Sequence, residues 1–230
     1  MSWVNDALMR VQPSAAVVLT PVELAVIAAV ALGVVLIPPV WRYARLGVTL
    51  VHELGHALVG IAVGRRFTGF VLRGDASGHA VTRGPSSGAG LVATTWAGYP
   101  APALLAAGLA VAAGAGWAAP VLAVLGVVLV VAIVQVRSLI TAAVTVTTLV
   151  GVGSLWWWGA PQLQAQVLLG LAAVLLIGAW RHLIAAMKDV SVGNDARALA
   201  RLTRVPRVVW LGTYVLVCGG SAWVMVDAVR

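Results

Sequence analysis

Long apolar runs separated by short polar segments dominate the pattern of the chain. A run of about 20 apolar residues is long enough to cross the hydrocarbon core of a bilayer as a helix. Seven runs of this kind predict transmembrane helices at 22–40, 47–64, 88–114, 119–135, 139–157, 163–186 and 208–228. Residues 1–20 show neither this pattern nor the features of a signal peptide, and they predict a polar N-terminal arm.

The connecting segment at 65–87 has a different periodicity. It contains two short β-prone runs, at 67–72 and 79–82, on either side of the turn-forming sequence GDASG at 74–78. This arrangement predicts a β-hairpin after the second span. The expected fold class is therefore an all-α polytopic membrane protein of about seven transmembrane helices with one small β-hairpin.

The composition agrees with a membrane protein. Of the 230 residues, 61% are hydrophobic and 10% are charged, and the mean hydropathy is +1.01. Soluble domains have about a quarter of their residues charged. We find no internal repeat and no soluble second domain, so residues 1–230 are expected to form one integral-membrane domain with an arm (1–20), a hairpin loop (65–87) and a polar segment (188–206).

The cysteine content limits the kinds of disulfide and metal site that the chain can form. Cys218 is the single cysteine, which excludes a disulfide framework and a zinc site made of several thiolates. Lys188 is the single lysine, whereas arginine, alanine, valine and glycine are abundant. This usage favours a GC-rich bacterial genome.

Basic residues are distributed unevenly among the predicted loops. The net charge of +8 does not indicate a nucleic-acid partner, because the arginines lie between apolar runs, where membrane lipid headgroups are the expected contacts. If the seven spans alternate, one side carries Arg10, Arg65, Arg66, Arg73, Arg83, Arg137, Arg181, Lys188, Arg197, Arg201, Arg204 and Arg207. The other side carries only Arg42, Arg45 and Arg230. The positive-inside rule then places the N-terminus, the hairpin and 188–206 on the cytoplasmic face of a bacterial inner membrane.

The sequence VHELGHALVG at 51–60 places three ionisable side chains inside the second span. His52 and His56 are four residues apart, so they project from one face of a helix. Two imidazoles at this spacing can bind one Zn²⁺, and Glu53 can accept a proton from an activated water. The chain has only four histidines and two glutamates, so this pattern arises by chance in fewer than about one such sequence in a thousand. Buried structural histidines are the alternative, which is disfavoured because ionisable groups in a span are costly.

A catalytic zinc site needs a third protein ligand and leaves a fourth position for water. The candidates on the side where the second span ends are His79 and Asp75 in the hairpin, and Asp189 and Asp195 before the last span. Topology alone does not choose among them. In another interpretation, Asn194 or Asp195 is the N-cap of a short amphipathic helix that runs to Thr203.

Other polar positions are candidate contacts for a metal or a substrate. His79 is a candidate for approaching a metal or a substrate, and the Asn194 amide is a candidate donor to a tetrahedral oxyanion. Gly98-Tyr99-Pro100 interrupts the third span, either as a substrate-facing helix break or as a packing kink, and the kink is favoured. His182, at the inner end of the sixth span, receives no role.

HELGH within a span, followed by a hairpin and further spans, resembles the M50 site-2 protease family of intramembrane zinc metallopeptidases. The compact bacterial M50B-like branch, which has no PDZ domain, also has a segment similar to GNDARALARLTRVP (193–206) before its last span. The resemblance implies one zinc per chain on His52, His56 and Asp195, with Glu53 as the base. It also implies that the substrate is a transmembrane or membrane-proximal peptide.

A protein of the same fold without catalytic activity is the alternative function. Such a protein would act as a complex subunit, a chaperone or a small-solute carrier. The intact Glu53 argues against it, because a purely structural zinc site does not need a base.

Overall fold

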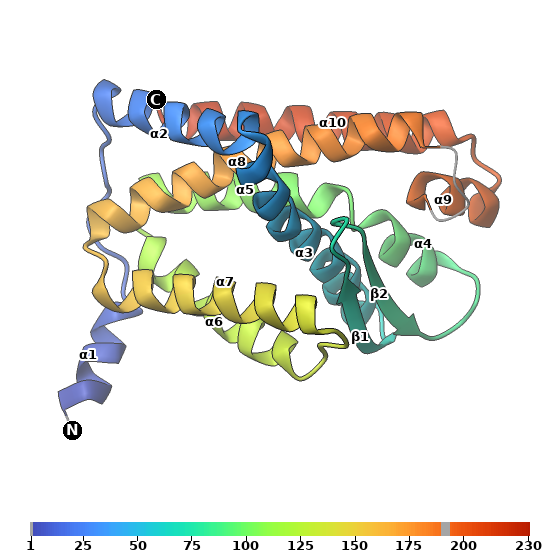
Figure 1. Ribbon diagram of the computed structural model, residues 1–230, viewed down its shortest axis with the longest axis horizontal. Helices are drawn as coiled ribbons and strands as arrows, with labels where there is room; N and C mark the ends of the chain where they lie inside the picture. The colour runs from blue at the N-terminus through green and yellow to red at the C-terminus, as the bar shows by residue number, and fades with distance from the viewer. Residues whose placement is uncertain (1, 190–193) are drawn as a thin grey trace.

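The computed structural model describes residues 2–189 and 194–230, which form a mainly helical molecule with one two-stranded sheet (Figure 1). The helices are α1 (Ser2–Arg10), α2 (Pro21–Leu36), α3 (Pro38–Ala62), α4 (Ala89–Trp96), α5 (Pro100–Gly114), α6 (Ala118–Ile133), α7 (Leu139–Trp158), α8 (Pro161–Lys188), α9 (Asp195–Thr203) and α10 (Arg207–Asp227). The strands are β1 (Arg66–Leu72) and β2 (Gly78–Arg83).

The two ends of the long axis differ in what they contain (Figure 1). We call the end with β1, β2, α4 and α9 the hairpin end. The opposite end, with residues 10–20 and the turns at 115–117 and 159–160, is called the arm end. Proline is the first residue of α2, α3, α5 and α8. The N–H groups of a first helical turn make no hydrogen bond within the helix, so the missing N–H of proline costs nothing there, and its fixed φ suits the turn.

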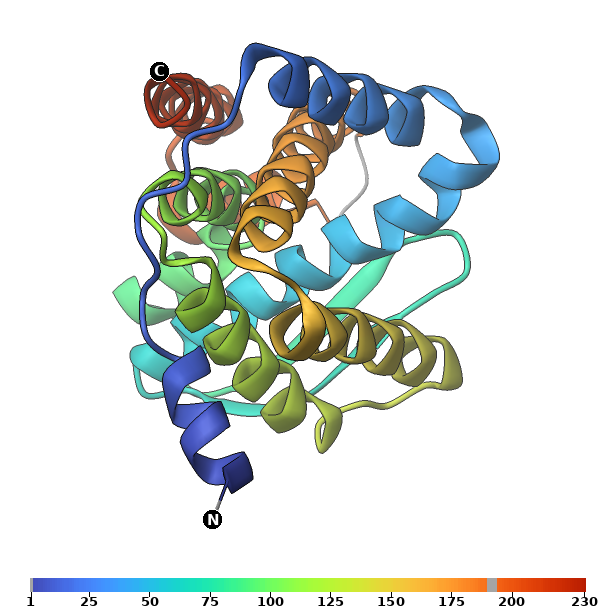
Figure 2. The same ribbon diagram turned by 90° about the vertical axis from the view of Figure 1, so that its left-hand side faces the viewer.

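Helix α8 is central in the bundle. The view along the long axis shows it surrounded by α2, α5 and α10 (Figure 2), and it packs against all three. The facing residues of α5 and α8 are largely alanines and leucines, such as Ala106, Ala110, Ala165 and Leu168, which are at most 1% exposed. Small side chains let two helix backbones approach closely, which is the usual basis of helix packing in a membrane.

Two helix breaks change the span count that the sequence predicts. Helices α2 and α3 are joined at Ile37 and bent by 97°, and α4 and α5 are bent by 65° at the break that contains Gly98. The cause at Ile37 is local, because Pro38 disfavours the helical conformation in the residue before it. By length and composition, three helices within the described ranges can cross a membrane alone, or up to five spans result if each bent pair counts as one. The seven separate spans are therefore not reproduced.

The arm is attached to the turns at the arm end of the molecule. Ser14 N donates to the Gly116 carbonyl (2.9 Å), Val17 N donates to the Gly114 carbonyl (3.1 Å), and Trp156 Nε1 donates to the Arg10 carbonyl (3.3 Å). The arm thus lies at the end of the molecule opposite the hairpin, whereas seven alternating spans would place the two on one side; the membrane face of each stays a prediction. The physical reason is that α2 and α3 do not cross the molecule twice as two antiparallel spans.

The predicted hairpin is confirmed, with bounds within one residue of those expected from the sequence. Strands β1 and β2 are antiparallel, and the register pairs Phe70 with Ala80 and Leu72 with Gly78. The outer edge of β1 is covered, because Phe70 N donates to the Gln135 carbonyl and Arg137 N donates to the Phe70 carbonyl. Phe70 and Leu72 are buried against α3 and α6, which fixes the hairpin over the second half of α3.

Candidate functional site

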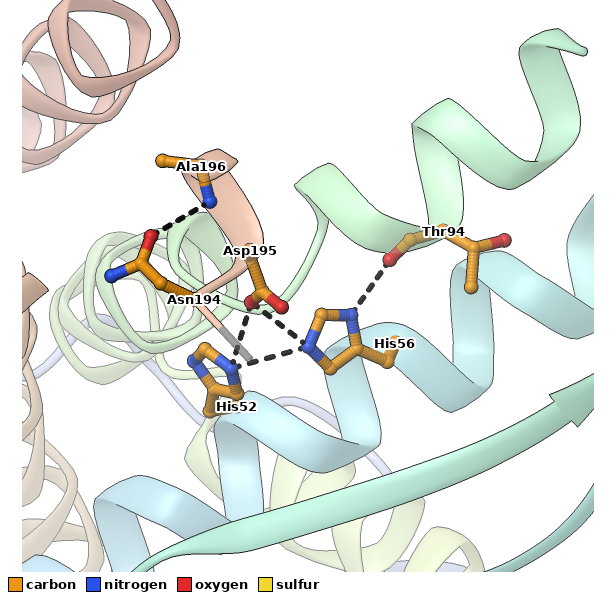
Figure 3. Close-up of polar contacts among 6 residues, drawn as sticks. All are labelled: His52, His56, Thr94, Asn194, Asp195 and Ala196. Atoms are coloured by element: carbon orange, nitrogen blue, oxygen red, sulfur yellow. Dashed lines mark hydrogen bonds and ion pairs between the residues drawn. The ribbon is translucent and has the colours of Figure 1, made fainter. Parts of the chain in front are cut away.

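Helix α3 carries the two histidines of the sequence motif on one face. His52 and His56 point in the same direction, and their Nε2 atoms are 3.2 Å apart (Figure 3). Their rings meet edge to face, with centroids 4.8 Å apart. The i, i+4 spacing thus brings both nitrogens to one point, as predicted from the helical period.

The first turn of α9 brings Asp195 to the same point from a distant part of the chain. Asp195 Oδ2 lies 3.3 Å from both His52 Nε2 and His56 Nε2 (Figure 3). Asn194 is the N-cap of α9, since its side-chain oxygen accepts from Ala196 N (3.0 Å). The capping interpretation of this segment is therefore confirmed for Asn194, and it leaves the Asp195 carboxylate directed at the histidines.

These three atoms have the spacing of a zinc site. Tetrahedral Zn²⁺ holds nitrogen and oxygen ligands at about 2.0–2.1 Å, which separates neighbouring ligand atoms by about 3.3–3.4 Å. The observed separations are 3.2, 3.3 and 3.3 Å. Asp195 Oδ2 is buried and makes no hydrogen bond with a partner among the described residues. The set of donors and its spacing therefore fit a zinc ion.

The protonation of His56 agrees with this fit. His56 Nδ1 is 2.7 Å from the carbonyl oxygen of Thr94, in the last turn of α4. A carbonyl only accepts hydrogen bonds, so Nδ1 carries the proton, and in the neutral ring Nε2 has the lone pair. This lone pair faces a carboxylate oxygen and a second imidazole nitrogen. A metal ion held by these atoms would replace their repulsion with coordination, and the Nδ1 bond to Thr94 orients the His56 ring for that role.

Two glycines permit the close approach of backbone to these side chains. A Cβ atom on Gly98 would come closer than 3.0 Å to Nε2 of both His52 and His56. A Cβ atom on Gly78, in β2, would come closer than 3.0 Å to the carboxylate of Glu53. The Gly98 break, interpreted from the sequence as a packing kink, is thus also a wall of the site.

A cavity of about 640 Å³ opens over these residues. Its lining includes His52, Glu53, His56 and Asp195, together with β2 and α4. The side chains of His52, His56 and Asp195 are 14%, 12% and 20% exposed, so the donor atoms are partly shielded and still reachable. Glu53 is 4% exposed and lies beneath the backbone of Gly78.

The other candidates for a third ligand lie elsewhere around the site. Asp75 is in the hairpin turn, where its Oδ1 accepts from Ser77 N (2.9 Å) and Ser77 Oγ (2.7 Å). These bonds from Ser77 lower the pKa of the Asp75 carboxyl. His79 and Asp189 line the same cavity as the histidines, but within the described ranges only Asp195 joins the two histidines in a group with metal-site spacing.

The structure also assigns a positional role to Asn194. Its amide nitrogen donates to the Ala186 carbonyl (3.1 Å) while its oxygen caps α9, and the residue is 3% exposed. Both ends of the side chain thus hold α9 against the end of α8. The role as an oxyanion donor stays a prediction.

Two aromatic rings beside His52, His56 and Asp195, which we call the metal-site group, were not predicted from the sequence. The ring of Tyr99 meets that of His52 edge to face at 4.9 Å, and the ring of His182 lies 6.5 Å from it. His182 Nε2 is buried without a hydrogen-bond partner in the described part of the chain. The GYP break was a usable signal for Tyr99. His182 comes from α8, and no local pattern connects it to α3.

Comparison with known proteins yields one family. The family model described as Peptidase M50B-like matches residues 25–225, which include every residue of the metal-site group. No curated protein and no solved structure matches the chain.

Proposed function

Because the chain belongs to the Peptidase M50B-like family, we propose that it is a membrane-embedded zinc endopeptidase of the site-2 protease kind. The observation that supports this most strongly is the convergence of His52 Nε2, His56 Nε2 and Asp195 Oδ2 beside the carboxylate-bearing Glu53. The proposal assigns one zinc per chain to the first three residues and the base to the fourth.

The proposed reaction is hydrolysis of a peptide bond. Zn²⁺, when bound, supplies Lewis-acid activation of a water molecule and of the scissile carbonyl group. Glu53 accepts the proton that the water loses as its oxygen adds to the carbonyl carbon. Glu53 then gives this proton to the leaving nitrogen as the C–N bond breaks, so that the carboxylate is regenerated. The close packing of Glu53 beneath the backbone of Gly78 limits the movement of its side chain during both transfers.

The substrate class that we propose is an extended segment of a membrane protein or a membrane-proximal peptide. Residues 78–82 of β2 line the cavity. Within the described ranges the sheet consists of β1 and β2 alone. The 135–137 segment covers β1, so the edge left for an added strand is that of β2. An added strand gains main-chain hydrogen bonds that replace its helical ones, and at this edge it lies beside Glu53.

Comparison of the two glutamates tests the proposed activity. Membranes from cells that express the wild type, Glu53→Gln or Glu23→Gln are analysed by mass spectrometry for new peptide termini in membrane proteins. Glu53→Gln should keep its zinc and lose cleavage by about 10²–10⁴-fold, because an amide cannot accept the proton. Glu23 lies at the arm end, 2.8 Å from Gln166 Nε2, so Glu23→Gln should cleave as the wild type does. Equal cleavage by all three would favour a non-catalytic subunit, chaperone or carrier.

We further propose that the hairpin end faces the cytoplasm and that both termini lie on the other side of the bacterial inner membrane. The hairpin end carries Arg65, Arg66, Arg73, Arg83, Arg137, Lys188, Arg197, Arg201, Arg204 and Arg207. Among the described basic residues, the arm end carries only Arg10 and Arg230. The positive-inside rule favours the proposed orientation, which reverses the side expected for the N-terminus from seven alternating spans.

Thiol labelling in intact cells tests this orientation. Cysteine is placed at Ser77 or at Ser14 in a Cys218→Ala background, and an impermeant thiol reagent is added from outside. Cysteine at position 14 should be labelled and cysteine at position 77 should be protected. The opposite result would show that the hairpin faces outward.

A further inference from the structure

A second cavity, of about 540 Å³, lies where the α2–α3 bend, α8 and the hairpin turn meet. One wall is apolar and consists of the end of α2 and the first turn of α3, including Trp41. The other wall carries three guanidinium groups, those of Arg42, Arg45 and Arg181. The sequence-based topology had placed Arg181 on the side opposite Arg42 and Arg45, and the bend at Ile37 brings all three together.

One of the three arginines is fixed in place by the protein. Arg181 donates to the carbonyl oxygen of Val35 (2.9 Å), and its guanidinium lies 4.4 Å from the centre of the Trp41 ring. The stacking orients the planar group and leaves other N–H donors available on its edge. A guanidinium held in this way is preorganised to bind an anion.

The described residues do not balance the positive charge of this cavity. The side chains of Arg42 and Arg45 make no hydrogen bond or ion pair with any described residue. Asp75 is the carboxylate among the lining residues, and its Oδ1 is engaged by Ser77. Three cations and one anion leave a formal charge of +2 in one cavity of a chain that is 61% hydrophobic. An anionic ligand would offset the mutual repulsion of the arginines. A guanidinium group can donate two parallel hydrogen bonds to the oxygens of one phosphate group.

The apolar wall indicates what else the ligand contains. It continues from the cavity onto the outer surface of the bend, where Leu36 is 71% exposed and Ile37 is 50% exposed. In a bilayer, such residues contact acyl chains. A ligand that satisfies both walls therefore has a phosphate group joined to a hydrocarbon chain.

We propose that this cavity binds the phosphate headgroup of an anionic phospholipid, with an acyl chain along the end of α2. The two cavities share Arg45 and Ala76 as lining residues. Thr49 Oγ1 donates to the Ala76 carbonyl (2.9 Å) at their boundary, which ties the hairpin turn to α3. The bound headgroup thus lies against the turn whose next residues, Ser77 and Gly78, line the cavity of the metal-site group.

Lipid retention measured on the whole purified protein tests this inference independently of any peptidase activity. The protein in detergent is mixed with phosphatidylglycerol or phosphatidylcholine of identical acyl chains, and bound lipid is measured by native mass spectrometry. The wild type should retain phosphatidylglycerol over phosphatidylcholine. Arg42→Gln with Arg45→Gln should lower this preference by about tenfold or more, because each basic residue contributes separately to the attraction. This double variant keeps Arg181 and its contacts, so the fold is retained.

A matched control removes charges elsewhere at the hairpin end. Arg66→Gln with Arg83→Gln changes two exposed arginines of the paired strands and should leave the lipid preference unchanged. An equal loss in this control, or no preference in the wild type, would overturn the proposal. Soluble glycerophosphate, which has the headgroup phosphate without acyl chains, should displace the lipid poorly. Full displacement at concentrations comparable to the lipid would assign the cavity to a free phosphate compound and overturn the lipid assignment.

Discussion

The two ends of the molecule treat their polar groups in opposite ways. At the arm end, Gln164 is 3% exposed and its amide nitrogen donates to the carbonyls of Leu155, Trp156 and Gly159. Glu23 accepts from Thr20, Gln162 and Gln166. At the hairpin end and beside it, several buried polar atoms lack hydrogen-bond partners among the described residues. They are Asp195 Oδ2, His182 Nε2, Arg207 Nε, Trp210 Nε1 and Tyr214 OH.

This difference separates groups that stabilise the fold from groups that are available to a ligand. A buried polar atom without a partner costs free energy, so proteins rarely keep one without a reason. At the arm end, internal hydrogen bonds satisfy the buried polar groups, so this cost does not arise. At the hairpin end, Asp195 and His182 instead line the cavity of the metal-site group. Substitutions at the arm end should therefore change stability alone, whereas those at the hairpin end should change metal binding and cleavage.

The largest effect is expected from removal of both histidines. His52→Ala with His56→Ala should reduce bound zinc from about one ion per chain to almost none, because two of the three protein ligands are lost. Metal analysis of the purified protein measures this directly. Peptide cleavage should disappear together with the zinc. Zinc that persists undiminished in the double variant would place the metal elsewhere.

Asp195→Asn should have the next largest effect. The side chain keeps its size, and asparagine is tolerated at a helix start, so α9 should form as before. Loss of the negative charge should weaken zinc binding by at least the roughly 10–100-fold typical of outer-shell changes. Competition with a chelator measures the affinity. Asp189→Asn is the control, since Asp189 lines the same cavity outside the metal-site group. If both variants bind zinc as the wild type does, His79 becomes the next candidate for the third ligand.

Gly98→Ala should have a smaller effect through the shape of the site. The added methyl group would come closer than 3.0 Å to both Nε2 atoms. Overpacking of this kind costs about 1–3 kcal/mol, which should appear as weaker zinc binding and slower cleavage. Gly108→Ala, in the same helix pair, has open space for the methyl group and should be neutral or slightly stabilising. Equal zinc affinity in the two variants would show that Gly98 does not shape the site.

Local patterns in the sequence predicted the parts of the site that depend on neighbours in the chain. The HELGH helix, the hairpin and the short helix to Thr203 are all confirmed. Each is encoded within about ten residues, by helical spacing, turn residues or a cap. Asp195 was proposed by family resemblance, and its distances to the histidines agree with that assignment.

What the sequence did not predict depends on contacts between distant segments. The 97° bend at Ile37 requires α3 to leave the direction of α2, although the hydropathy pattern alone predicts two separate spans at 22–40 and 47–64. The bend brings Arg45 beside Arg181, and the packing of α8 brings His182 beside His52. Hydropathy marks where a chain enters lipid, but it does not determine the angle between consecutive helices.

The smallest effect on the site is expected from a substitution at the arm end. Gln164→Ala removes the donor that satisfies three carbonyl groups between the end of α7 and the start of α8. Leaving buried acceptors unpaired costs about 1–3 kcal/mol, and the turn at Gly159 has little space in which to rearrange, because a Cβ there would meet Leu155. The midpoint of thermal unfolding should fall by several degrees, as expected for about 1–3 kcal/mol in a domain of this size. Zinc content and the rate of cleavage at low temperature should equal those of the wild type. A loss of zinc in Gln164→Ala would show that the two ends are coupled through α8, and the separation of roles between them would be wrong.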